Sequence, residues 1–158
     1  MQMKTLQAGD KAPQFSLSNQ NDETISLADY AGKKVLVYFY PKAMTPGCTV
    51  QAQGLRDVKD ELAANNVEII GISPDAVKRL PKFADKESLN FTLLSDEDHA
   101  VADAFGVWGP KKFMGKEYDG IHRLTFLIDE NGVVEHVFTK FKTKDHHTVV
   151  LDYVKSDA

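Results

Sequence analysis

A strand, a turn and the start of a helix are encoded by residues 35–48, which read VLVYFYPKAMTPGC. Residues 35–40 are continuously apolar or aromatic, as in a strand that is buried on both faces. Thr45 suits the N-cap of a helix through its hydroxyl, and Pro46 suits the first helical position because its φ is already fixed. Cys48 then lies in the first turn, where unpaired N–H groups and the helix dipole favour a thiolate. The turn therefore predicts a reactive cysteine, whereas residue type alone would suggest an inert buried one.

The segments that follow this turn complete a βαβ unit. Residues 46–64 predict a helix with one apolar face, and residues 67–72 predict a second buried strand. Such a unit is parallel and right-handed. The order of elements predicts an α/β fold with a mixed central sheet flanked by helices. The other predicted elements are a hairpin over 14–18 and 23–26, a helical turn over 27–31, a helix opening at 73–75 and kinked or split by Pro81, a strand over 91–94, a helix over 97–105, a loop over 107–120, a hairpin over 123–128 and 133–138, and a last helix capped by Asp145.

The composition indicates one domain spanning residues 1–158. The chain is 42% hydrophobic, and no change of composition divides it. Its formal net charge is −4 and its 19 Lys and Arg residues are scattered, which argues against nucleic-acid binding. The apolar runs are too short for a membrane span, and the N-terminus lacks the apolar core of a signal peptide. We therefore expect a cytoplasmic protein, which agrees with a single unpaired cysteine in a reducing compartment.

Five short motifs lie between residues 38 and 129. They are PxxxTxxC at 41–48, YFYP at 38–41, FTLLSD at 91–96, GVWG at 106–109 and RLTFLID at 123–129. Together they resemble the peroxiredoxins, a family of thiol peroxidases, and in particular the bacterioferritin comigratory protein or peroxiredoxin Q branch. The resemblance implies a thioredoxin-like fold with an N-terminal hairpin and a peroxiredoxin-type insertion. It also implies reduction of hydrogen peroxide and organic hydroperoxides without metal, haem, flavin or other cofactor.

The resemblance implies a role for each residue of the first motif. Cys48 is expected to attack the O–O bond as the peroxidatic nucleophile and to become a sulfenic acid. Thr45 is expected to hydrogen-bond the peroxide or the thiolate, although its residue type alone makes it only an N-cap. Pro41 is expected to shield the thiolate from water, or else simply ends the strand. Gly47 belongs to the same motif and is expected to support it.

Two residues outside this motif are implied by the same resemblance. Arg123 is expected beside the thiolate, where a guanidinium stabilises the negative sulfur and polarises the peroxide through its fork of donors. Gln51, one helical turn after Cys48, is expected to support the arginine. Without the resemblance, Arg123 would be interpreted as a solvated charge at the start of a strand, and Gln51 as helix surface.

The chain departs from this branch in its cysteines. Many members carry a resolving cysteine five residues after the first, where this chain has Gln53, and others carry it on the next helix, which has none here. The sulfenic acid therefore cannot close an internal disulfide. This predicts a one-cysteine mechanism, recycled by an external thiol reductant such as thioredoxin, glutaredoxin or glutathione. Because the branch is largely monomeric, we also expect a monomer.

Other interpretations of the sequence have less chemical support. A dithiol exchanger of the thioredoxin type does not fit, because Thr45 stands where C-x-x-C needs its first thiol. The pair His146 and His147 does not predict a metal site, since neighbours point to different helix faces, and we expect both to be solvated at the helix start. The remaining alternative is a thioredoxin-like redox-sensing or holdase module. Turnover separates the two, because a sensor is oxidised once per molecule.

Overall fold

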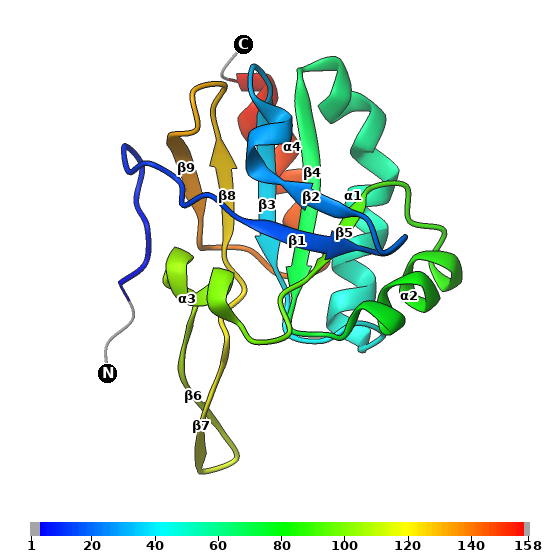
Figure 1. Cartoon of the computed structure of the whole chain (residues 1–158), viewed down its shortest axis with the longest axis vertical. Helices are drawn as coiled ribbons and strands as arrows, with labels where there is room; N and C mark the ends of the chain where they lie inside the picture. Colours follow the sequence, from blue (N-terminus) through cyan, green and yellow to red (C-terminus); the bar gives the residue numbers. More distant parts are fainter. Residues whose placement is uncertain (1–3, 157–158) are drawn as a thin grey trace.

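The computed structural model describes residues 4–156 and contains a central sheet with helices on both faces (Figure 1). The strands are β1 (Ser16–Asn19), β2 (Thr24–Ser26), β3 (Lys34–Phe39), β4 (Val67–Ser73), β5 (Thr92–Ser95), β6 (Trp108–Phe113), β7 (Lys116–Ile121), β8 (Thr125–Ile128) and β9 (Val134–Phe138). The helices are α1 (Pro46–Ala64), α2 (Leu80–Lys86), α3 (Ala100–Phe105) and α4 (His146–Ser156), with 3-10 turns η1 (Leu27–Tyr30) and η2 (Val77–Arg79). The large sheet has the order β2-β1-β5-β4-β3-β8-β9, and β6 pairs with β7 alone.

The predicted βαβ unit forms the centre of this sheet. β3 and β4 are parallel, β4 and β5 are parallel, and β8 runs antiparallel to β3. The sheet is therefore mixed, as predicted. In the β3–β8 register Tyr38 lies opposite Thr125, so the end of β3 and the start of β8 meet at one edge of the sheet. α1 begins at this edge, which is the lower edge in Figure 1.

The central strand β3 separates two hydrophobic cores. Leu36 and Tyr38 pack into the core that contains buried residues of α1 and α4. Val37 and Phe39 pack into the core on the opposite face, which contains α3. Alternate side chains of a strand point to opposite faces, so β3 is buried on both. This explains why its sequence is a continuous apolar run rather than an alternating one.

Two predicted elements differ in the structure. The segment predicted as a loop over 107–120 is mostly the antiparallel hairpin of β6 and β7, which extends away from the sheet (Figure 1). Its turn is made by Met114 and Gly115, both with positive φ (52° and 81°), as in the turns that match hairpin twist. The helix predicted to open at 73–75 begins later and is split into the 3-10 turn η2 and the helix α2, which starts at Leu80. Pro81 lies in the first turn of α2 and does not kink it, because its missing N–H would have no intrahelical partner there anyway.

The other predicted elements are present within a few residues of their predicted bounds. α1 spans Pro46–Ala64, as predicted. Between residues 4 and 156, no helix is both long enough and apolar enough to cross a membrane.

Candidate active site

Cys48 lies in the first turn of α1 with only 1% of its surface exposed. It packs in the same core cluster as Tyr38 and Tyr40 of the preceding strand segment. The N–H of Thr49 donates to the carbonyl oxygen of Thr45 at 2.9 Å, which closes the first turn of the helix around the cysteine. The strand-to-helix turn thus places the thiol inside the protein.

Arg123 reaches Cys48 from the segment between β7 and β8. Its Nη2 donates to Cys48 Sγ at 3.2 Å, and its Nη1 donates to Gln51 Oε1 at 3.0 Å. One planar guanidinium therefore bonds a sulfur and an amide at once, an arrangement that the point charge of a lysine cannot reproduce. The structure brings together the three residues that the resemblance associates.

Backbone contacts hold the segment that carries Arg123. This segment joins β7 to β8, so Arg123 lies two residues before the strand rather than at its first position. The N–H of Phe39 donates to the carbonyl of Leu124 at 3.1 Å, and the N–H of His122 donates to the carbonyl of Val107 at 2.8 Å. The arginine is therefore fixed relative to the end of β3, from which Cys48 follows.

Gln51 and Gly47 shape the space around the guanidinium. Gln51 is fully buried, which excludes the interpretation of this position as helix surface. A Cβ added at Gly47 would lie 3.1 Å from Arg123 Nη2, which is closer than a comfortable contact. The absence of a side chain at Gly47 therefore gives the arginine room to reach the thiol.

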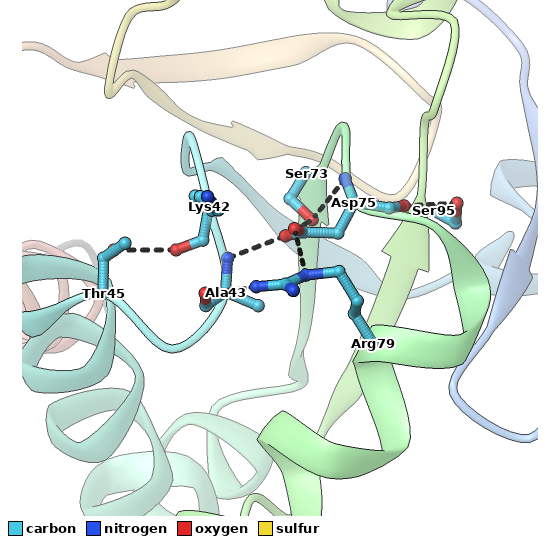
Figure 2. Close-up of polar contacts among 7 residues, drawn as sticks. All are labelled: Lys42, Ala43, Thr45, Ser73, Asp75, Arg79 and Ser95. Atoms are coloured by element: carbon cyan, nitrogen blue, oxygen red, sulfur yellow. Dashed lines mark hydrogen bonds and ion pairs between the residues drawn. The ribbon is translucent and has the colours of Figure 1, made fainter.

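Thr45 occupies the N-cap position but does not cap the helix with its side chain. Its backbone is extended (φ −87°, ψ 155°), as at an N-cap. Its hydroxyl, however, donates to the carbonyl of Lys42 at 2.7 Å (Figure 2). The prediction of a side-chain cap is therefore wrong, because the tight loop brings the Lys42 carbonyl closer to the hydroxyl. Donation of the proton to Lys42 leaves the oxygen lone pairs able to accept a hydrogen bond from a ligand.

Pro41 is half-buried and follows β3 directly. Its neighbour Tyr40 donates its N–H to the carbonyl of Ile72 at 3.1 Å, so the chain stays beside β4 up to this point. The proline thus stands where the strand leaves the sheet for the loop to α1. Its shielding of the thiolate remains a prediction.

His146 is a polar residue whose burial the sequence did not indicate. It is completely buried at the start of α4, and its Nε2 is 2.9 Å from Thr125 Oγ1. Burial lowers its pKa to about 3, and the charges of His147 and Arg123 act in the same direction. The expectation of a solvated histidine is therefore wrong for His146, because the start of α4 faces β8 rather than solvent.

Lys111 is a second residue that the sequence did not indicate. Its Nζ donates to the carbonyl of Ile121 at 2.7 Å, at the base of the β6–β7 hairpin. Burial lowers its pKa, and so does the positive charge of Arg123, while Cys48 acts in the opposite direction.

Residues 4–156 hold no group of three or more His, Cys, Asp or Glu that could bind a metal ion.

Comparison with known proteins shows the family to which this chain belongs. The model of the AhpC/TSA family matches residues 8–137. The chain is 62% identical over 156 residues to Peroxiredoxin Bcp of Escherichia coli (strain K12), a match that covers 99% of this chain and 100% of that protein. This chain is a peroxiredoxin of the AhpC/TSA family. It is also 46% identical over 151 residues to Peroxiredoxin Bcp of Bacillus subtilis, covering 96% of both.

Solved structures agree with this assignment. A structure of Xanthomonas campestris Peroxiredoxin Q is 32% identical and superposes with a TM-score of 0.86, over 98% of this chain and 97% of that one. The resemblance to the bacterioferritin comigratory protein branch and the thioredoxin-like fold are therefore confirmed. As a peroxiredoxin, the protein is a thiol-dependent peroxidase.

Gln53 stands five residues after Cys48, the position discussed above for a resolving cysteine, and its side chain makes a hydrogen bond there. Its Nε2 donates to Glu87 Oε1 at 2.8 Å, and Glu87 directly follows α2. Arg56 Nη1 also donates to the Glu87 carbonyl at 2.7 Å. This part of α1 is thus anchored to the end of α2, while the first turn faces Arg123.

Proposed function

We propose that this peroxiredoxin reduces hydrogen peroxide and small organic hydroperoxides through Cys48 as its single nucleophile. The observation that supports this most strongly is the 3.2 Å contact of Arg123 Nη2 with the buried Cys48 Sγ. A guanidinium beside a sulfur at a helix N-terminus favours the thiolate, which is the nucleophilic form. Cys48 is also the only cysteine in the chain.

In the first step the Cys48 thiolate attacks one oxygen of the peroxide. The S–O bond forms as the O–O bond breaks, so the sulfur is oxidised to a sulfenic acid while the peroxide is reduced. The leaving oxygen takes up a proton and departs as water or an alcohol. Arg123 stabilises the negative charge that moves from sulfur to oxygen. Thr45 accepts a hydrogen bond from the peroxide O–H, and Pro41 keeps water from the thiolate.

In the second step external thiols return the sulfur to its reduced state. The first thiol condenses with the sulfenic acid, releasing water and leaving a mixed disulfide on Cys48. The second thiol attacks this disulfide, releases the Cys48 thiolate and leaves as the oxidised disulfide. Thioredoxin, glutaredoxin and glutathione have the required chemistry. We propose that the protein works in this way as a cytoplasmic monomer of one domain.

A peroxide-consumption assay tests this function. Peroxide loss is followed with glutathione and glutaredoxin in one arm, and with thioredoxin and thioredoxin reductase in the other. We expect many equivalents of peroxide per chain in at least one arm, and none for Cys48→Ser. Consumption that stops at one equivalent per chain in both arms would support the sensor alternative instead. After one equivalent of peroxide without reductant, intact mass should rise by about 16 Da, the mass of one oxygen on sulfur.

A further inference from the structure

Asp75 is a buried carboxylate that joins two loops at the edge of the sheet where Cys48 lies. It follows β4, and only 7% of its surface is exposed. Its Oδ2 accepts hydrogen bonds from the Ala43 N–H at 2.7 Å and from Ser73 Oγ at 2.8 Å. Its Oδ1 accepts from Arg79 Nε at 3.0 Å (Figure 2). A buried carboxylate with this set of donors is well satisfied and rigidly held.

Both backbone polar groups of Ala43 are bound by this pair of side chains. Ala43 donates its N–H to Asp75 and accepts at its carbonyl from Arg79 Nη2 at 3.3 Å. Its side chain is 1% exposed. Asp75 is itself anchored, because Ser95 Oγ donates to the Asp75 carbonyl at 2.6 Å. The segments after β3 and β4 are thereby joined to the last residue of β5 at one point.

The loop that Asp75 holds has a conformation that does not persist by local preference alone. Met44, the residue after Ala43, has a φ of 68°. This is the left-handed region, which is unfavourable for a residue with a side chain and persists when surrounding contacts impose it. Thr45 comes next, and its carbonyl begins the hydrogen bonding of α1. The position of Ala43 therefore determines where Thr45 and the first turn of α1 lie.

We propose that Asp75, together with Arg79, is a positioning residue for the reaction of Cys48 with peroxide. The cysteine and Thr45 are carried by the loop and by α1, whereas Arg123 is carried by the segment before β8. The loop before α1 and the segment before β8 must be held in fixed positions relative to each other for Arg123 and Thr45 to act on one peroxide. Asp75 touches neither Cys48 nor Arg123 among its hydrogen bonds and acts through the Ala43 backbone. The reaction itself is that of the proposed function, on which this inference rests.

Three variants remove different parts of this arrangement. Asp75→Asn keeps an oxygen for Ala43 and Ser73 but presents an amide N–H to Arg79. Arg79→Ala removes the guanidinium from the same contact, and Asp75→Ala removes every side-chain bond. We expect the second-order rate of Cys48 oxidation by hydrogen peroxide to fall at least about tenfold for Asp75→Ala, because small displacements of reacting groups are costly. We expect a fall of about threefold for Asp75→Asn and for Arg79→Ala. A variant that combines Asp75→Asn with Arg79→Ala should be no slower than the slower of these two single variants, because both substitutions remove the same contact.

Asp96 supplies a matched control. It is also a buried aspartate directly after a strand, with 1% exposure, but its carboxylate accepts from the N–H groups of Val101 and Ala102 in α3. Asp96→Asn therefore weakens a buried carboxylate contact of the same kind without touching the loop before α1. We expect its peroxide rate to stay within about twofold of wild type, even where its loss of stability in urea equals that of an Asp75 variant.

A second measurement separates positioning from general loss of stability. Cys48 is almost completely buried, so its alkylation by iodoacetamide requires the loop to open. The Asp75 and Arg79 variants should be alkylated faster while reacting with peroxide more slowly, and Asp96→Asn should change neither rate at equal stability. If Asp75→Ala does not fold, Asp75→Asn and Arg79→Ala provide the same comparison.

Several outcomes would overturn the inference. These are peroxide and alkylation rates within twofold of wild type in the Asp75 and Arg79 variants, or equal changes in Asp96→Asn at equal stability. The alkylation measurement does not depend on peroxidase activity. A wild-type protein without peroxide turnover would therefore contradict the proposed function, while the alkylation rates would still show whether Asp75 holds the loop.

Discussion

Arg123 and Thr125 are two residues apart, yet they place very different groups beside the helices. Arg123 is half-buried, carries a charge and bonds the thiol of α1. Thr125 is completely buried and bonds His146 of α4, whose pKa is lowered to about 3 by burial and by nearby positive charges that include Arg123. A guanidinium stays protonated in proteins, whereas an imidazole loses its proton when burial lowers its pKa. The comparison shows that a cation contacts the Cys48 sulfur, while a neutral histidine ring contacts Thr125 two residues further along the chain.

The largest effect is expected from Arg123→Lys, which tests the charged side of this comparison. The ammonium keeps the charge but cannot bond Cys48 and Gln51 with one rigid fork. We expect Cys48 oxidation by peroxide to slow by about 100-fold, the lower end of the loss expected for one oriented donor at a reacting centre. Stopped-flow rates with stoichiometric peroxide measure this. A rate equal to that of wild type would show that charge alone is sufficient.

A pair of threonine variants tests whether the two sides differ in kind. Thr45→Val removes the hydroxyl proposed to bind peroxide, and we expect a rate about tenfold lower, the equivalent of one hydrogen bond. Because this hydroxyl does not cap α1, the melting temperature should change little. Thr125→Val removes the partner of buried His146 and should lower the free energy of unfolding by about 1–3 kcal/mol. Its peroxide rate should stay close to that of wild type, and the opposite pattern would contradict the comparison.

The neutral side can be tested by the pH dependence of stability. The folded pKa of His146, about 3, lies below the unfolded value of 6.5, so the unfolded chain binds the proton first as pH falls. The neutral histidine stabilises the fold fully above pH 6.5, and this contribution is lost as pH falls from 6.5 toward 3. Between pH 6.5 and 5, wild type should lose roughly 1.5 kcal/mol more unfolding free energy than His146→Gln. Parallel urea curves for the two proteins would contradict the prediction.

The smallest effect is expected from Gln53→Ala, which concerns α1 away from both residues. It removes the hydrogen bond to Glu87, whose side chain is largely buried. We expect a loss of about 1 kcal/mol of stability and a peroxide rate within about twofold of wild type. Urea unfolding and stopped-flow rates measure the two quantities. A large fall in rate would mean that the anchored part of α1 also takes part in the chemistry.

The sequence predicted the centre of the molecule well because burial is recorded there in local patterns. The apolar run at 35–40 and the helical pattern that starts at Pro46 determine strand and helix without reference to distant residues. The β6–β7 hairpin was predicted as a loop because most of its residues are exposed on both faces and show no apolar alternation. A two-stranded ribbon outside the main sheet has no buried face to impose that alternation.

The site was predictable only in part, for a similar reason. Cys48 is indicated by its turn, but Arg123 and Gln51 were expected only from the family resemblance, since their contact crosses 72 residues. The hydroxyl of Thr45 bonds the Lys42 carbonyl because of the loop shape, which in turn depends on Asp75, 32 residues after Ala43. The hydrogen-bond partner of the buried His146 is Thr125, 21 residues earlier. Such contacts are created by the fold, and no local pattern records them.

Gly47 places a limit on how this protein can evolve. Glycine is the weakest helix former after proline, and alanine at a helical position is more stable by up to about 1 kcal/mol. The methyl group of an alanine at position 47 would stand 3.1 Å from Arg123 Nη2 and push the guanidinium away from the Cys48 sulfur. Selection for thermal stability would thus favour alanine at this position, whereas selection for peroxide reduction would favour glycine. A lineage in which alanine replaced this glycine would have gained stability and lost peroxidase rate.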